Sequence, residues 1–121
     1  MQYMLLIYTD EQAWAALDER ERNAIVGEYF ALTDELRTAG AYIAGAPLEP
    51  TQRASTVRLR DGEELVTDGP FAETKEQLGG YFLIEADSDD EACGWAAKIP
   101  AARYGSIEVR PVLPVGAAAP G

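Results

Sequence analysis

The sequence contains no histidine and a single cysteine, Cys93. Histidine is the commonest general base at neutral pH and the commonest transition-metal ligand, so its absence excludes imidazole-based triads and His-ligated zinc sites. One cysteine forms neither an internal disulfide nor a Cys-rich metal site, which is typical of a protein in the reducing cytoplasm. We therefore expect a cytoplasmic protein with no metal and no cofactor.

Long apolar runs and a basic leader are also missing. No stretch approaches the roughly 18 apolar residues that a spanning helix needs, and no basic leader precedes the apolar run that begins near Met4. Basic residues are scarce, since 10 Lys and Arg stand against 21 Asp and Glu, for a net charge of −11. This balance predicts no membrane contact and no direct nucleic-acid binding, because phosphate backbones are repelled. It suits solubility or a basic protein partner.

Two segments are apolar on both faces and predict central strands covered on both sides: Gln2–Tyr8 and Tyr81–Glu85. Two amphipathic helices are indicated, each opened by a capping box, one from Asp18 with Glu21 and one from Ser88 with Glu91. The remaining expected elements are a helical turn at 11–17, strands at 41–46 and 106–112, a hairpin at 55–60 and 63–66 turning at Asp61-Gly62, and a helical turn around 74–78.

This order predicts an α+β fold, a ferredoxin-like split βαβ sheet with both helices on one face. The other face has nothing from its own chain to cover it. Burying it requires a second sheet, and the simplest source is an identical subunit, so we expect a homodimer. The 121 residues fit one domain, and the small, Pro-containing end of the chain is expected to be flexible.

The most particular stretch is Thr67-Asp68-Gly69-Pro70-Phe71-Ala72-Glu73-Thr74-Lys75-Glu76, a turn-forming Gly-Pro pair within a run of charged residues. It resembles the signature of the DGPF-type branch of the YCII-related family. Further blocks that look like that family are Tyr3–Tyr8, 36–48, 79–84 and 100–111. The resemblance assigns a YCII-related domain to 1–113 and leaves 114–121 as a short flexible tail.

The resemblance implies a dimeric α+β barrel, two ferredoxin-like sheets packed face to face. Other YCII-related branches carry a histidine paired with an acid that has been proposed as catalytic, and this sequence has no such histidine. The wider superfamily includes isomerases, monooxygenases and decarboxylating enzymes. Relatives of the DGPF branch are often linked to extracytoplasmic-function sigma factors, which implies a regulatory context.

Asp68 has two interpretations. Its carboxylate can cap the turn at Gly69, or it can be a buried catalytic acid or base in a pocket between sheet and helices. Glu73 and Lys75, with Glu76, can orient a polar ligand or lie on a solvated face. Phe71 is predicted to anchor the loop in the core.

Tyr42, Arg103 and Tyr104 are the remaining ligand-binding candidates. Arg103 can pair with a substrate carboxylate, and Tyr104 can donate to an anionic intermediate. The alternative is that both satisfy strand-end carbonyls and pack on neighbours. Cys93, beside apolar residues of a predicted helix, is expected to be structural rather than nucleophilic.

Three functions remain open at this point. The first is a small-molecule pocket in each half of the barrel, with acid–base chemistry by Asp68 and anion binding by Arg103 and Tyr104. The second is a non-catalytic regulatory or protein-interaction module linked to extracytoplasmic-function sigma factors. The third is a signature loop that serves folding and dimerisation alone.

Overall fold

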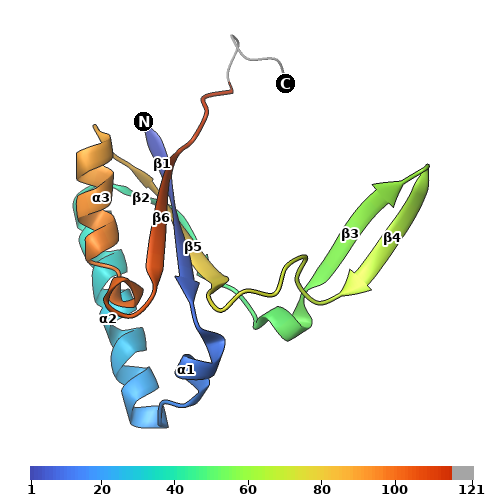
Figure 1. Cartoon of the computed structure of the whole chain (residues 1–121). Helices are drawn as coiled ribbons and strands as arrows, with labels where there is room; N and C mark the ends of the chain where they lie inside the picture. Colours follow the sequence, from blue (N-terminus) through green and yellow to red (C-terminus); the bar gives the residue numbers. More distant parts are fainter. Residues whose placement is uncertain (116–121) are drawn as a thin grey trace.

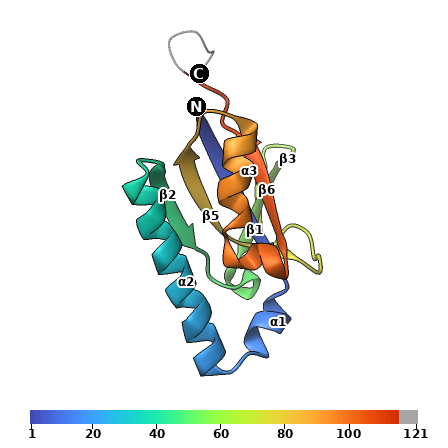
Figure 2. The same cartoon turned by 90° about the vertical axis from the view of Figure 1, so that its left-hand side faces the viewer.

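The computed structural model describes residues 1–115, and the fold is of the predicted α+β class. A four-stranded antiparallel sheet carries helices on one face, and a separate two-stranded hairpin projects from the opposite side (Figures 1 and 2). The elements are β1 Gln2–Thr9, α1 Glu11–Ala15, α2 Glu19–Thr38, β2 Tyr42–Pro47, η1 Thr51–Arg53, β3 Ser55–Arg60, β4 Glu63–Asp68, β5 Gln77–Glu85, α3 Asp89–Ala97, η2 Pro100–Arg103 and β6 Ser106–Pro111.

The two segments that are apolar on both faces are the central strands, as predicted. The sheet order is β2-β5-β1-β6, and β1 pairs antiparallel with both β5 and β6. One face of β1 is buried against α2 and α3 through Tyr3, Leu5 and Ile7. The ring of Tyr3 is buried while its hydroxyl reaches the start of α3 and donates to Asp89 Oδ1 at 2.7 Å.

Both predicted helices are present, with different caps. At α2 the Asp18 side chain accepts from the Glu21 backbone and Glu21 accepts from the Asp18 backbone, which confirms the predicted capping box. At α3 the Ser88 hydroxyl accepts from Glu91 N at 3.1 Å, but the Glu91 side chain accepts from Asp87 N. The reciprocal half of the second capping box is therefore wrong, because Glu91 bonds one residue further upstream.

The core lies between the sheet and the two main helices. Leu32 and Leu36 of α2 and Ala92 and Ala96 of α3 are buried there, facing β1 and β5. Phe30 of the same helix is exposed. No helix within residues 1–115 covers the opposite sheet face, where alternate residues are only partly buried: Met4, Leu6, Tyr8, Tyr81 and Leu83.

The hairpin β3–β4 forms as predicted and extends two residues further, to Asp68. Its turn has positive φ at both central residues, 52° at Asp61 and 77° at Gly62, which matches the right-handed strand twist. The hairpin stands clear of the sheet (Figure 1). Large apolar side chains on it remain exposed, with Val57 at 62%, Leu59 at 68% and Val66 at 59%.

The helical turn predicted around 74–78 is wrong, because β5 already begins at Gln77. Gly79 and Gly80, expected to precede this strand, lie inside it at a register shift opposite Ile7 and Tyr8. A Cβ on Gly80 would approach the Ala46 carbonyl oxygen to 3.0 Å, so the close pairing of β2 with β5 requires glycine there.

No helix within residues 1–115 is long and apolar enough to cross a membrane. Most of the predicted flexible tail, residues 116–121, lies outside the described residues.

Candidate functional site

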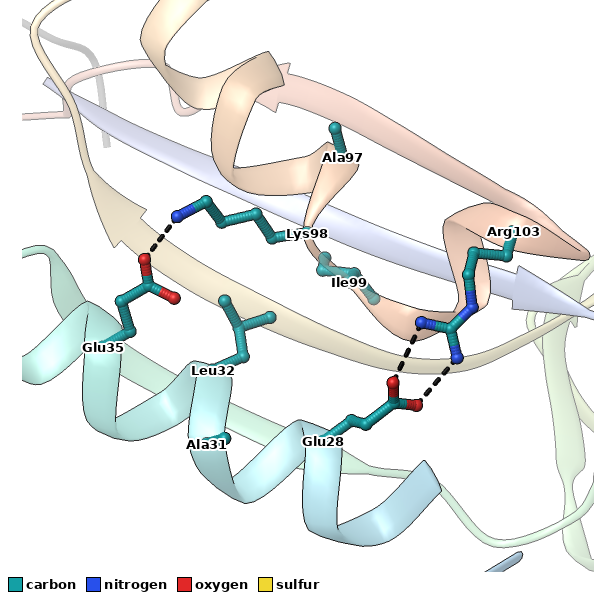
Figure 3. Close-up of a pocket in the computed structure, with 8 residues that line it drawn as sticks. All are labelled: Glu28, Ala31, Leu32, Glu35, Ala97, Lys98, Ile99 and Arg103. Carbon is teal, nitrogen blue, oxygen red and sulfur yellow. Dashed lines mark hydrogen bonds and ion pairs between the residues drawn. The ribbon is translucent and has the colours of Figure 1, made fainter. Parts of the chain in front are cut away.

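An open groove of about 430 Å³ runs between α2 and the segment from α3 to η2. Figure 3 shows two ion pairs that cross it to α2. One comes from Lys98, directly after α3, and the other from Arg103 at the end of η2. Lys98 contacts Glu35, and Arg103 contacts both carboxylate oxygens of Glu28, at 3.1 and 2.7 Å. The groove lining is Glu28, Ala31, Leu32, Glu35, Ala97, Lys98, Ile99 and Arg103.

The bidentate contact sets the charge of both partners. Hydrogen bonding from Arg103 holds the pKa of Glu28 below its ordinary value, and the carboxylate raises the pKa of Arg103 in return. Both side chains are therefore ionised at neutral pH. Because both are about half exposed, water screens the pair, and its role is to orient the guanidinium more than to stabilise the fold.

Aromatic side chains continue from this end of the groove into the core. Tyr29 stacks on Phe82 with ring centroids 6.4 Å apart, and burial, reinforced by the neighbouring Tyr104, raises the pKa of Tyr29 to about 12. Burial also raises the pKa of Tyr104, against the opposing effect of Arg103. Both phenols are therefore protonated at neutral pH and can donate hydrogen bonds.

Tyr42 lies against another side of the same Phe82 ring. Their centroids are 6.4 Å apart at an interplanar angle of 76°, and the Arg37 guanidinium sits 4.7 Å from the Tyr42 ring centroid. The edge-on contact and the cation over the ring hold Tyr42 at the start of β2. Phe82 thus separates Tyr42 from Tyr29.

The structure brings together only part of the predicted set. Arg103 and Tyr104 meet on the helical side. Asp68, Glu73 and Lys75 are exposed and lie on the hairpin or in the loop that follows it, on the other side of the sheet (Figure 1). Within the chain, the predicted acid or base and the predicted anion-binding pair do not share a pocket.

Backbone groups close the turn after Asp68. Gly69 N donates to Ala54 O at 2.7 Å, and Thr56 Oγ1 donates to Gly69 O at 2.8 Å. Gly69 has a φ of 96°, a conformation that favours glycine. The loop then returns to the sheet where Ser106 Oγ donates to Glu76 Oε1 at 2.9 Å. These contacts account for Gly69 and Glu76 within the signature loop.

Phe71 corrects one expectation. It is 80% exposed and does not anchor the loop in the core. Cys93 is also exposed, on α3, although neighbouring residues of that helix are buried. Within residues 1–115, no three His, Cys, Asp or Glu side chains cluster in a way that could hold a metal ion.

Sequence reasoning missed Glu28, Glu35 and Lys98 as groove residues, and Tyr29 as a neighbour of the Arg103 end. A tyrosine among the apolar positions of an amphipathic helix, with an acid beside it, is a usable signal for a polar end of the core. The pairing of Glu28 with Arg103 carries no local signal, because 75 positions separate the two residues.

Comparisons with known proteins are consistent with this architecture. The family model described as the YCII-related domain matches residues 1–116. An uncharacterized protein of Rhizobium meliloti (strain 1021) is 41% identical over 114 residues, which cover 93% of this chain and 92% of that protein.

Proposed function

The chain belongs to the YCII-related domain family, and on that premise we propose that it acts as a cytoplasmic homodimer that binds a small organic molecule. The proposed assembly is a dimeric α+β barrel of two ferredoxin-like sheets. The strand order β2-β5-β1-β6, with α2 and α3 on one face, supports this assignment.

The observation that carries the dimer is the uncovered sheet face. Met4, Leu6, Tyr81 and Leu83 line it on the two central strands and are only partly buried. An apolar sheet face is stable when another layer covers it, and a second identical sheet does so in a symmetric way. The face also carries little net charge, since Glu108 and Arg110 of β6 offset each other, so two strongly acidic chains can meet there.

The ligand we propose is a small polar molecule with a carbonyl or hydroxyl oxygen, bound at the Arg103 end of the groove. The oriented guanidinium of Arg103 supplies donors in the groove, and Leu32 and Ile99 supply apolar lining. Two protonated phenols, Tyr29 and Tyr104, neighbour Arg103 outside the groove lining and would supply further donors. The groove volume lies within the range typical of small-molecule sites. Because Glu28 already occupies Arg103, a neutral or weakly anionic ligand fits better than a strong acid.

Acid–base chemistry by Asp68, with Glu73 and Lys75 as polar contacts, remains a proposal of a different kind. All three are exposed in a single subunit, on the side of the sheet from which the β3–β4 hairpin projects, so their site would lie between the two subunits of the dimer. Such chemistry would proceed without histidine.

The test combines oligomeric state with ligand binding. Light scattering after gel filtration should give twice the 13.1 kDa chain mass. Thermal unfolding against a metabolite library should yield a stabilising ligand, worth about 2.7 kcal/mol at 100 times its dissociation constant. The shift should be lost in Arg103→Ala and Tyr104→Phe and retained in Arg20→Ala, an exposed arginine elsewhere on α2.

Asp68→Ala assigns the ligand to one side of the sheet. Retained binding in this variant, with loss in Arg103→Ala, supports the groove and removes Asp68 from the binding site. Loss in Asp68→Ala alone would move the site to the dimer interface and contradict the groove. A monomer with no ligand across acids, phenols, sugars and nucleotides would contradict the whole proposal.

A second candidate is favoured by the exposed apolar side chains of the hairpin. A non-catalytic module that contacts other proteins, in a pathway linked to extracytoplasmic-function sigma factors, would use such a surface. The two candidates differ in what covers the hairpin. If the homodimer leaves it exposed, the protein-interaction function gains weight.

A further inference from the structure

The β3–β4 hairpin, Ser55–Asp68, is amphipathic, and we refer to it as the arm. Paired residues of antiparallel strands point to the same side, so Val57 and Val66, which pair directly, share a face with Leu59. The opposite face carries the directly paired Thr56 and Thr67, with Arg58, Arg60, Glu63 and Leu65 along the same side. The first face also carries Glu64, which pairs with Leu59, and the Ser55–Asp68 pair at the base of the hairpin. The arm therefore has one face with a cluster of three large apolar side chains and one face that is polar apart from Leu65.

Hydrogen bonds to the rest of the chain hold the segment that leads into the arm. Leu48 N donates to Gly79 O at 2.9 Å, and Thr51 N donates to both Glu11 carboxylate oxygens at 3.1 and 3.2 Å. The arm itself projects beyond the sheet edge on the side that carries no helix within residues 1–115 (Figure 1). Val57, Leu59 and Val66 are therefore mostly exposed in the single chain.

An isolated two-stranded hairpin is marginally stable in water, so an arm of this kind gains stability when another surface covers it. Phe71, three residues after the end of the arm, is also mostly exposed and would also gain from being covered. The hydrogen bond from Thr56 to Gly69 ties the start of this loop to the arm.

We propose that the apolar face of the arm, with Phe71, packs against a second copy of this chain, whose own arm packs back in return. This inference rests on the proposed homodimer and names the segment that completes it. In a two-fold dimer the contact is reciprocal, so both arms are covered at once. A different protein bound to the arm alone would leave the apolar sheet face exposed.

The area needed for a stable dimer favours this arrangement. Four strands spaced about 4.8 Å apart and six residues long present a face of about 400 Å². A stable interface buries about 800 Å² on each partner, so the sheet face alone supplies about half. One face of the two-stranded arm offers about 200 Å² by the same spacing. Each subunit buries one face of its own arm and also the surface on which the partner's arm packs. These two contacts together supply the remaining area of about 400 Å² on each partner.

The experiment places one added negative charge on either face of the arm. Leu59→Glu puts it on the apolar face, and Thr67→Glu puts it on the polar face of the same hairpin. Dimer dissociation constants come from sedimentation equilibrium, and circular dichroism checks that each variant retains its fold. We expect Leu59→Glu to weaken the dimer at least about tenfold and Thr67→Glu to weaken it less than about threefold.

Hydrogen exchange gives an independent readout on the unaltered chain. Amides of the arm should be protected well above the dimer dissociation constant and should lose protection on dilution below it, while β1 and β5 stay protected. Phe71→Ser should weaken the dimer in the same direction as Leu59→Glu.

The outcomes separate the arm from the dimer. A dimer that is equally strong in wild type and Leu59→Glu, with arm exchange independent of concentration, overturns the arm contact and leaves the sheet-to-sheet dimer intact. Equal weakening by both substitutions overturns it too, because general charge repulsion then explains the effect. A wild-type chain that remains monomeric overturns the proposed dimer together with the arm.

Discussion

The four-stranded sheet with its helices, here called the body, and the arm both contain strands in which apolar residues alternate along the chain. The apolar residues are buried in the body and exposed in the arm. In the body, alternating apolar residues of β1 and β5 face α2 and α3, and Leu5 and Ile84 are 1% and 0% exposed. In the arm, an equally regular alternation leaves Val57 and Leu59 in solvent. Alternation therefore predicts which face of a strand seeks cover, and the rest of the fold determines whether the same chain provides it.

The two regions are also held differently. The body is closed by long-range strand pairing, such as that of β1 with β5 and with β6. The arm is closed by its own turn and its own ladder, with a few hydrogen bonds at the base. We therefore expect substitutions in the body to change global stability and substitutions in the arm to act locally or through the proposed dimer.

The largest expected effect is a cavity in the body. Ile84→Ala should lower the free energy of unfolding by about 2–5 kcal/mol, because Ile84 is fully buried against the helices. Leu59→Ala removes a similar side chain from the arm and should cost much less in chemical denaturation at concentrations that favour the monomer. Equal costs under those conditions would remove the distinction between body and arm.

A steric test at the start of β6 comes next. A Cβ on Gly105 would meet the Tyr8 carbonyl oxygen well inside van der Waals contact, so Gly105→Ala should destabilise by about 1–3 kcal/mol. Gly94 lies inside α3 with nothing within 4 Å of an added Cβ, and Gly94→Ala should stabilise by about 0.5–1 kcal/mol. Urea unfolding measures both, and a loss of stability in the Gly94 variant would contradict the packing described for α3.

The arm has its own glycine test. Gly62 has a φ of 77°, so Gly62→Ala should strain the turn by about 1 kcal/mol. The effect should appear as faster hydrogen exchange within β3 and β4, with exchange in β1 and β5 unchanged. Slower folding or faster exchange throughout the body would show that the arm is coupled to the core.

The last prediction concerns alkaline pH, away from physiological conditions, and is confined to the body, because the arm contains no tyrosine. The pKa of Tyr29 rises from 10.0 to about 12 on folding, so the unfolded chain loses this proton at lower pH than the folded one. The contribution is complete below pH 10 and is lost as pH rises towards 12. Tyr29→Phe should therefore show a shallower fall of thermal stability between pH 10 and 12, and an identical slope would contradict the burial of this phenol.

Much of the fold was readable from local pattern. The central strands were predicted from residues that are apolar on both faces, and the start of α2 from Asp18 and Glu21, because such signals depend on neighbours in sequence. The error at 74–78 has a tertiary cause, since the loop is shaped by its return to Ser106 and by the register shift at Gly79.

The candidate site was harder to predict. Arg103 and Tyr104 were singled out by residue type, but their partners Glu28 and Tyr29 lie on a helix far away in sequence. Phe71 was placed in the core because aromatic residues are usually buried, and a single chain does not bury it. The contacts of Arg103 and Tyr104 and the exposure of Phe71 do not depend on the spacing of nearby residues, so the sequence pattern could not predict them.

By itself the sequence determined the chemistry that is excluded and the periodicities of the elements, because composition, capping and turn formation act over a few residues. The absence of histidine, the positive-φ turn at Asp61 and Gly62 and the double-sided strands are of this kind. Only the tertiary structure decided which apolar faces the chain covers and which charged groups meet. Those outcomes depend on the direction in which the arm leaves the sheet and on how α2 lies against η2, and both are set by packing across the whole chain.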